Sequence, residues 1–331
     1  MSNATVVVSG TKIAEEIGTS RSEVWRLIQQ LRGLGVDVAG HPATGYQVRA
    51  VPDLLLPEML APALKGTVFS AHSGAHLTKQ IHHYYKIGST NSEAMRAASE
   101  GAPEGSIFLA EQQLAGRGRG AHTWHSALSA GIYCSVILRP AMPPSDALIF
   151  SLAAGLAVRA AVGEIAPRLR VDLKWPNDLL VGGKKFCGIL TEMNAEATRV
   201  RHLVVGVGIN VNQVKFPAEL RETATSLRIA TGSEWSRVEL CGALLKSLDR
   251  EYRALVDDPG AHASILRRFE ESSSSVRGRK VSLSVNGDAN RDDGDENSGL
   301  AGVTEGLDDR GFLRVRTAEG LTTVVSGTVK I

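Results

Sequence analysis

Two periods of hydrophobic spacing divide the N-terminal part of this chain into helices and a hairpin. Apolar residues recur every three or four positions in residues 13–17 and again in Val24–Leu31, as amphipathic helices require. Residues Val36–Val48 then alternate between apolar and polar around His41–Gly45, which is typical of a β-hairpin. This order predicts a winged helix-turn-helix over residues 1–50, whose second helix would enter the major groove of DNA.

The second of these helices begins with a capping box, Ser20 to Glu23. Its polar face supplies the candidate DNA contacts, which are Arg21, Ser22, Arg26, Gln29 and Gln30. A winged helix-turn-helix normally opens with a further helix, but Met1–Gly10 contains only a short β-prone run, so the module is expected to be incomplete. A small oligomerisation or capping module is the alternative.

The middle of the chain mixes strand and helix patterns. Residues 51–79, rich in proline, are expected to form a linker, and residues 80–270 a single α+β domain with a mixed sheet covered by helices. Leu148–Ile165 is apolar on all sides and therefore predicts a buried helix. The remaining predicted elements are a helix opened by a capping box at Thr90–Glu93, a helix at Leu240–Leu255, strands at Tyr84–Ile87, Ser106–Ala110, Ile132–Leu138, Val171–Lys174 and Leu203–Val211, and a hairpin over Leu179–Met193.

After the serine run Ser272–Ser275, short alternating stretches predict a small SH3-like β-barrel over residues 276–331. Within it, Asn286–Gly299 carries five acidic residues against one arginine. These acids lack the regular spacing and terminal glutamate of an EF-hand, so the stretch is interpreted as a disordered hairpin tip.

Composition is that of a soluble globular protein. The 331 residues are 43% hydrophobic and 22% charged, enough for two or three domains, and the net charge of +2 is too small to imply a polyanionic partner for the chain as a whole. The three cysteines, Cys134, Cys187 and Cys241, form no CxxC pair, which favours a reducing cytoplasm over a disulfide or zinc framework. Neither a signal segment nor a membrane-spanning run is expected.

Two motifs carry the chemistry. Gly116–Gly120 places Arg117 and Arg119 in a backbone that can wrap an anion, and Lys174–Asp178 adds a cation beside a turn. Taken alone, the first could be a solvated nucleic-acid tail and Lys174 a surface residue. Polar groups that could meet a ligand head group precede them, at the helix start Ser89-Thr90-Asn91 and at Gln113, although Thr90 could serve only as a cap.

In the same order along nearly the whole chain, these motifs resemble those of the biotin protein ligases, in particular the bacterial bifunctional type that also represses the biotin operon. The stretches that carry the resemblance are Ser89–Asn91, Glu111–Gly120 with Trp124, Lys174–Asp178, Lys185–Glu192 and Gly206–Asn210. Lipoate ligases of the same fold lack the paired Gly-Arg-Gly-Arg and Lys-Trp-Pro-Asn-Asp motifs. The chain departs from the bifunctional type after Arg119, where Gly120–Thr123 is less basic.

The resemblance implies a central domain of the class II synthetase-like type and a two-step reaction. Biotin and Mg-ATP would give biotinyl-5′-adenylate, from which a lysine of the biotin carboxyl carrier protein takes the biotinyl group. Lys174 and Arg119 would be catalytic, and Asn210 and Trp124 would lie at the ATP site. The biotin and adenylate would contact Ser89, Thr90, Asn91, Gln113, Arg117, Gly118, Arg119 and Lys174. Operator DNA and a homodimer are implied as further partners, with no metal ligands assigned. The alternatives are a biotin-responsive repressor that uses the ligase fold as its sensor, and a lipoate–protein ligase.

Overall fold

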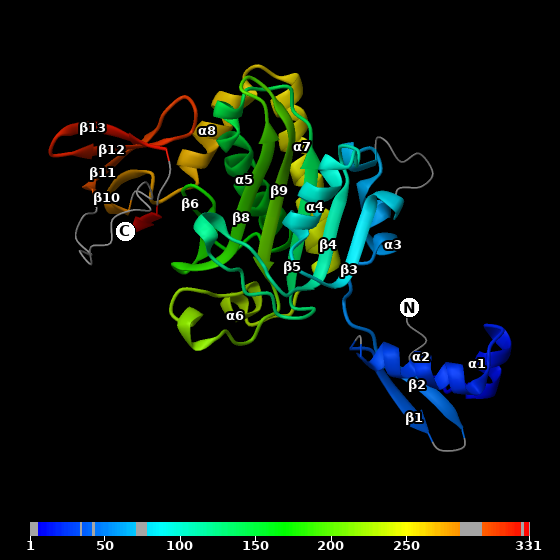
Figure 1. Cartoon of the computed structure of the whole chain (residues 1–331). Helices are drawn as coiled ribbons and strands as arrows, with labels where there is room; N and C mark the ends of the chain where they lie inside the picture. The colour runs from blue at the N-terminus through cyan, green and yellow to red at the C-terminus, as the bar shows by residue number, and fades with distance from the viewer. Residues whose placement is uncertain are drawn as a thin grey trace, which may run out of the picture. The chain divides into compact units, whose positions relative to one another are not determined.

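The structure, a computed structural model, describes residues 6–33, 35–41, 44–70, 78–284, 300–325 and 328–330. The chain divides into two compact units, Met1–Leu54 and Leu55–Ile331, coloured from blue to red along the sequence in Figure 1.

The N-terminal unit has the predicted order of two helices and a hairpin. Helices α1 (Gly10–Glu16) and α2 (Arg21–Gly33) precede the antiparallel strands β1 (Asp37–His41) and β2 (Gly45–Ala50). The Glu23 amide donates to Ser20 Oγ at 3.2 Å, as the predicted cap requires. A small core holds the unit together, and its buried residues are Ala14, Val24, Ile28, Val36 and Val38.

The β-prone run before α1 adds to the hairpin. From Val6 onward the described chain has no helix ahead of α1, and Val8 instead forms an antiparallel bridge with Tyr46 of β2. Gly45 makes this approach feasible, because a Cβ at that position would lie 2.0 Å from the carbonyl oxygen of Val8. Met1–Thr5 lie outside the described residues.

The second unit is built on a seven-stranded mixed sheet in the order β3-β4-β5-β9-β8-β7-β6. Its first two strands are parallel and are connected by helix α4 (Thr90–Ser99), whereas every other neighbouring pair is antiparallel. The mixed α+β architecture predicted from the sequence is thereby confirmed. The strands are β3 (Ile81–Ile87), β4 (Ile107–Gln113), β5 (Gly131–Leu138), β6 (Asp172–Lys174), β7 (Asp178–Val181), β8 (Lys184–Ala195) and β9 (Val200–Asn210).

Helices cover the two faces of this sheet unequally. The larger core lies under α5 (Leu148–Ile165) and α7 (Arg237–Asp257), and a smaller cluster lies under α4 on the opposite face (Figure 1). Along β9, Val205 belongs to the larger core and Val204 to the α4 cluster. Since side chains alternate along a strand, Gly206 and Gly208 face the same side as Val204. The α4 face therefore has a stretch of bare backbone just beyond α4.

Helix α5 has the predicted limits, and twelve of its eighteen residues are buried. With the turn before it, Pro144–Ile165, it is long and apolar enough to cross a membrane, with a mean hydropathy of 1.7. Because it packs against α7, α8 and the sheet, a core helix accounts for this composition.

The segment predicted as a linker is largely part of the second unit. Leu55, Leu60, Leu64 and Phe69 are fully buried in the larger core, so a linker over residues 51–79 is wrong for this stretch. Pro57 stands at the first turn of a short helix, α3 (Pro57–Leu60), where its fixed φ and missing N–H favour a helix start. Residues 71–77 lie outside the described part of the chain.

The C-terminal residues form a five-stranded antiparallel sheet in the order β13-β12-β11-β10-β14. The sequence prediction of β-structure is confirmed in this form, and closure into an SH3-like barrel stays a prediction. Helix α8 (Ala261–Glu271), which the sequence pattern did not predict, precedes this sheet. The acidic stretch falls within residues 285–299, outside the described residues. The strands are β10 (Arg277–Ser284), β11 (Leu300–Leu307), β12 (Leu313–Thr317), β13 (Gly320–Val324) and β14 (Thr328–Lys330).

Candidate functional site

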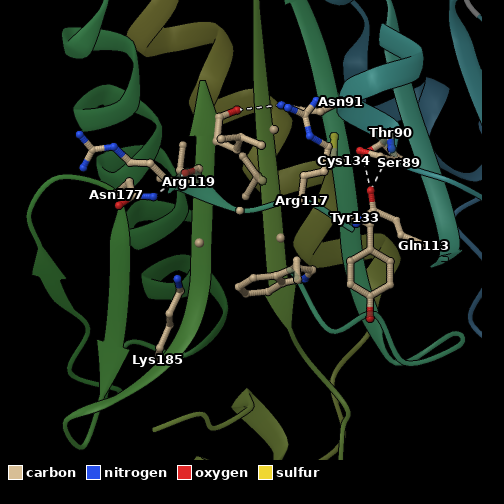
Figure 2. A pocket seen from close by; sticks show the side chains of 18 residues that line it. Ser89, Thr90, Asn91, Gln113, Arg117, Arg119, Tyr133, Cys134, Asn177 and Lys185 are labelled. Carbon is tan, nitrogen blue, oxygen red and sulfur yellow. Dashed lines mark hydrogen bonds between the residues drawn. The ribbon is translucent and has the colours of Figure 1, made fainter. Parts of the chain in front are cut away.

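A pocket lies on the α4 face of the central sheet, where β9 carries its glycines (Figure 2). Seven predicted binding residues line it together with Trp124: Ser89, Thr90, Asn91, Gln113, Arg117, Gly118 and Arg119. Residues from α4, β4 and the 116–124 loop therefore meet at one place.

Three glycines form the floor of this cavity. Gly188 of β8 pairs with Gly208 of β9, and the ring of Trp124 lies over both. A Cβ on Gly208 would come within 2.6 Å of that ring, and one on Gly206 within 1.9 Å of Asn91 Oδ1. Neither contact is tolerable, so the bare backbone is what admits the indole and the start of α4.

We expect Gly206→Ala to lower the affinity for the ligand by at least about tenfold, because the added methyl must displace Asn91, which lines the cavity. Isothermal titration of biotin, the ligand that the sequence resemblance implies, into the variant measures the change. Gly163→Ala is the matched control, since a Cβ there would meet nothing within 4 Å. Wild-type affinity in Gly206→Ala would contradict this account of the floor.

One end of the cavity is lined by uncharged hydrogen-bonding groups. Gln113 Oε1 accepts from the amide of Thr90 at 2.9 Å and from its hydroxyl at 3.1 Å, and Gln113 Nε2 donates to Ser126 Oγ at 3.2 Å. Ser89 is the N-cap of α4, so the cap predicted at Thr90 is one residue too late. The hydroxyl of Thr90 is thereby available to fix Gln113.

Two cations lie at the opposite end, Lys185 of β8 and Arg119 of the 116–124 loop (Figure 2). The ammonium of Lys185 lies 2.6 Å from Asp178 and 5.4 Å from the centroid of the Trp124 ring. Burial lowers the pKa of Arg119 below its usual value, and the nearby Asp178 partly opposes this effect. An arginine stays charged under these conditions, so this end of the cavity favours an anion.

Arg117 makes a different contact from the one expected. Its guanidinium forms a two-pronged ion pair with Glu192 of β8, at 2.8 Å and 3.2 Å. The sequence motif predicted a donor for phosphate or carboxylate. In the structure, this donor pair joins the loop to the sheet.

Lys174 is not among the residues that line the cavity, and Lys185 is. Lys174 lies on β6, the outermost strand of the sheet, and pairs there with Asp178 of β7. The turn between them brings Asn177 and Asp178 to β8, where Asn177 Nδ2 donates to the Ile189 carbonyl at 2.8 Å and Asp178 holds Lys185. The motif does belong to the site, but the lysine that reaches the cavity is Lys185 of β8, two strands away from Lys174.

Asn210 also lies outside the cavity lining, although it follows Gly206 and Gly208 on the same face of β9. Its side-chain amide is buried, donates to the Thr225 carbonyl at 3.1 Å and accepts from Gln213 at 3.1 Å. In this structure Asn210 fixes the segment after β9, so a direct contact with nucleotide has no support from the geometry.

Sequence patterns assigned no role to ten residues that line the cavity: Tyr133, Cys134, Asn177, Lys185, Gly188, Ile189, Leu190, Gly206, Val207 and Gly208. Most fall in stretches that carried the family resemblance, which was the available signal. Which of them face the cavity depends on strand register, and register is set by pairing between distant segments.

The Trp124 ring has one polar atom that no protein group satisfies. Its indole Nε1 is buried and has no hydrogen-bond partner within the described structure. The family resemblance implied a place at the ATP site for this residue, and the structure places its ring in the middle of the cavity.

In the part of the chain that the structure describes, no three His, Cys, Asp or Glu side chains gather as a metal site. The two carboxylates nearest the cavity, Asp178 and Glu192, are each paired with a cation. These residues therefore do not form a dedicated magnesium site. A magnesium ion bound through nucleotide phosphates would need few protein ligands.

In the N-terminal unit, α2 buries Val24 and Ile28 and exposes most of the predicted DNA-contacting residues. Arg26 forms a two-pronged contact with Glu23 along the helix, at 2.5 Å and 2.8 Å. The same exposed side carries Trp25, which is 58% exposed and was not among the predicted contacts. An exposed tryptophan four residues from both Arg21 and Gln29 gives this surface an apolar contact as well as polar ones.

Comparison with known proteins places both units. Residues 85–210 match the biotin/lipoate A/B protein ligase family, and residues 1–47 match an HTH domain. A bifunctional ligase/repressor of Bacillus subtilis (strain 168) is 35% identical over 326 residues, which cover 98% of this chain and 94% of the relative. A biotin–[acetyl-CoA-carboxylase] ligase of Mycobacterium tuberculosis is 31% identical over 83% of this chain and 96% of the relative. Among solved structures, a biotin protein ligase from Aquifex aeolicus in complex with biotin and ATP matches with a TM-score of 0.62 and 28% identity, over 76% of this chain and 97% of that chain.

Proposed function

Because this chain belongs to the family of bifunctional biotin ligases and repressors, we propose that it activates biotin with ATP and transfers the biotinyl group to a lysine of the biotin carboxyl carrier protein. The ligase activity is supported by the family to which the chain belongs. The acceptor protein and the roles of individual residues are our proposal.

The order of groups along the cavity is the observation that carries this assignment. Gln113 and Thr90 offer uncharged donors and acceptors at one end, Trp124 offers an apolar wall in the middle, and Lys185 offers a cation at the other. Biotin has the same order: a ureido ring, an aliphatic chain and a carboxylate. A molecule bound this way would direct its carboxylate toward Lys185 and Arg119.

In the first step, a biotin carboxylate oxygen attacks the α-phosphorus of ATP, the bond to the β-phosphate oxygen breaks, and pyrophosphate leaves. Carboxylate and phosphate repel one another, and Lys185 and Arg119 would reduce this repulsion. Bound magnesium would neutralise further phosphate charge, and we assign it no protein ligand.

In the second step, the neutral amine of the acceptor lysine attacks the carbonyl carbon of the adenylate. The bond to the phosphate oxygen breaks, AMP leaves, and the amine loses a proton to solvent. Because the mixed anhydride also hydrolyses, the 116–124 loop would serve to keep water out. Within this loop the Gly118 amide donates to the His122 carbonyl at 2.7 Å and the Trp124 amide to the Gly116 carbonyl at 2.9 Å.

The decisive test is ATP-dependent transfer of labelled biotin to a purified carrier domain. Release of pyrophosphate together with carrier labelling is expected. Biotin binding without either product would favour the alternative in which the ligase fold only senses biotin for a repressor. Transfer of lipoate in place of biotin would favour a lipoate ligase.

The N-terminal unit supports a second proposed function, operator binding through α2. The unit matches an HTH domain, and α2 exposes Arg21, Trp25 and Gln30. Because one such module binds specific DNA weakly, we propose that two copies engage two half-sites after adenylate-driven dimerisation. We further propose that the protein is cytoplasmic. We also propose that its C-terminal sheet closes as an SH3-like barrel.

Salt titration distinguishes the polar from the apolar side chains of α2. Arg21→Ala should weaken binding to the protein's own biotin-operon promoter and lower the slope of log K against log salt concentration by about one for each phosphate that is no longer neutralised. Trp25→Ala should weaken binding with the slope unchanged, because an apolar side chain releases no counterion. Fluorescence anisotropy with adenylate present measures both. Unchanged affinity in both variants would remove α2 as the DNA-binding element.

A further inference from the structure

The ion pair between Arg117 and Glu192 closes the rim of the cavity. Arg117 belongs to the glycine–arginine loop, and Glu192 lies on β8 on the same face as Gly188 and Leu190 of the cavity. The pair spans 75 positions of sequence and joins the loop to the central sheet.

Glu192 also holds the start of α4. Its Oε2 accepts from Asn91 Nδ2 at 3.0 Å, while Asn91 Oδ1 accepts from Ser135 at 2.6 Å. Arg117 reaches the same helix turn, with its Nη1 3.4 Å from Ser92 Oγ. One carboxylate thus connects three segments that bound the cavity: the loop, the first turn of α4 and strand β8.

The charges around the cavity indicate whether Arg117 is available to bind an anion. Arg117 and Glu192 together carry no net charge, whereas Lys185, Arg119 and Asp178 together carry one positive charge, so an anion is attracted to that end of the cavity rather than to Arg117. The side chains of Arg117 and Glu192 are 49% and 23% exposed, so water and salt can reach the pair. The strength of the contact should therefore depend on the salt concentration.

We propose that Glu192 is a positioning residue that fastens the Arg117 loop over the bound acyl adenylate and so retains this intermediate until the acceptor lysine arrives. This inference rests on the proposed ligase function. It assigns Glu192, at the rim of the cavity, a role in that function. Arg117 acts here as the fastened partner rather than as a phosphate ligand.

The test separates formation of the adenylate from its retention in the full chain. Glu192→Gln keeps the shape of the side chain but removes the charge that Arg117 needs. We expect the rate of adenylate escape, measured by trapping the free anhydride with hydroxylamine, to rise about fivefold, the scale of one partly exposed charged contact. Biotin-dependent pyrophosphate release should fall by a smaller factor.

Glu196→Gln is the matched control, since it removes the same charge from a Glu–Arg pair just beyond the end of β8, with Arg201 at 2.6 Å. Its escape rate should equal that of the wild type. Escape from the wild type should also rise with salt, because salt screens the pair, and escape from Glu192→Gln should respond much less.

Equal escape from Glu192→Gln and Glu196→Gln would overturn the proposal. So would tighter retention in Glu192→Gln, which would mean that the carboxylate competes with the ligand for Arg117. The proposal would also be contradicted if Glu192→Gln slowed pyrophosphate release by as large a factor as it raised adenylate escape. That result would assign Glu192 to the chemical step. The exchanged pair, Arg117→Glu with Glu192→Arg, should retain adenylate better than Glu192→Gln even if that variant folds poorly. Absence of pyrophosphate release in the wild type would instead refute the ligase function.

Discussion

Replacement of Lys185 by alanine is expected to slow adenylate formation by about a hundredfold or more, the scale seen when one preorganised charge-stabilising group is removed from an active site. The side chain lies within the cavity, held by Asp178 and by the ring of Trp124. It is one-third exposed, so its loss should leave the fold intact. Pyrophosphate release from biotin and ATP, with circular dichroism as a check of folding, measures the effect.

Two neighbouring lysines provide matched controls. Lys184 is adjacent in sequence but donates to the Arg221 carbonyl at 2.8 Å, and Lys174 lies on the outermost strand. Alanine at either position should change the rate only a few-fold. A large loss in Lys174→Ala with a small loss in Lys185→Ala would restore the assignment that the sequence favoured.

Replacement of Arg237 by methionine is expected to destabilise the protein by about 3–5 kcal/mol, the usual cost of leaving a buried charge without its partner. Arg237 of α7 and Glu111 of β4 are both fully buried and lie 2.8 Å apart. Glu111 also accepts from the Leu55 amide at 2.9 Å and lies 3.0 Å from His83 Nε2. Urea unfolding of the variant and the wild type measures the difference.

A double replacement distinguishes the effect of the unpaired charge from that of altered packing. Arg237→Met with Glu111→Leu should recover most of the stability, because no carboxylate is then left buried alone. Arg201→Met, which removes an exposed arginine, should have little effect. A loss in Arg237→Met as small as that in Arg201→Met would show that Glu111 is satisfied by its other partners.

The pH dependence of this loss has a definite sign. Burial raises the pKa of Glu111, but the hydrogen bond with His83 and the charge of Arg237 outweigh burial, and the net pKa lies below its usual value. Its contribution to stability is thus present above the unfolded-state pKa and is lost as pH falls through the folded-state value. Without Arg237 the folded-state pKa should rise, so the deficit of the variant should shrink as pH is lowered toward about 4.

The local pattern of apolar and polar residues was sufficient to predict several helices and helix ends of this protein. Residues Leu148–Ile165 are apolar on every side, and only a buried helix accommodates such a run, which explains why both ends of α5 were predicted correctly. The cap by Ser20 likewise depends on residues three positions apart, although the Glu23 carboxylate pairs with Arg26 and does not complete the predicted box. The linker prediction failed because the prolines were taken as the sign of a linker, whereas Leu55, Leu60 and Leu64 are buried in the larger core.

For the site as well, some residues could be predicted from local sequence and others only from the tertiary structure. The glycine–arginine loop, the start of α4 and Gln113 carry recognisable residue types at short spacing, and the sequence by itself placed them in one site. The choice between Lys174 and Lys185, and the partner of Arg117, depended on which strands pair and on which face each side chain lies. Pairing of β8 with β9 puts Gly188, Gly208 and Glu192 on one face, and such long-range register is fixed only when the whole sheet closes its core.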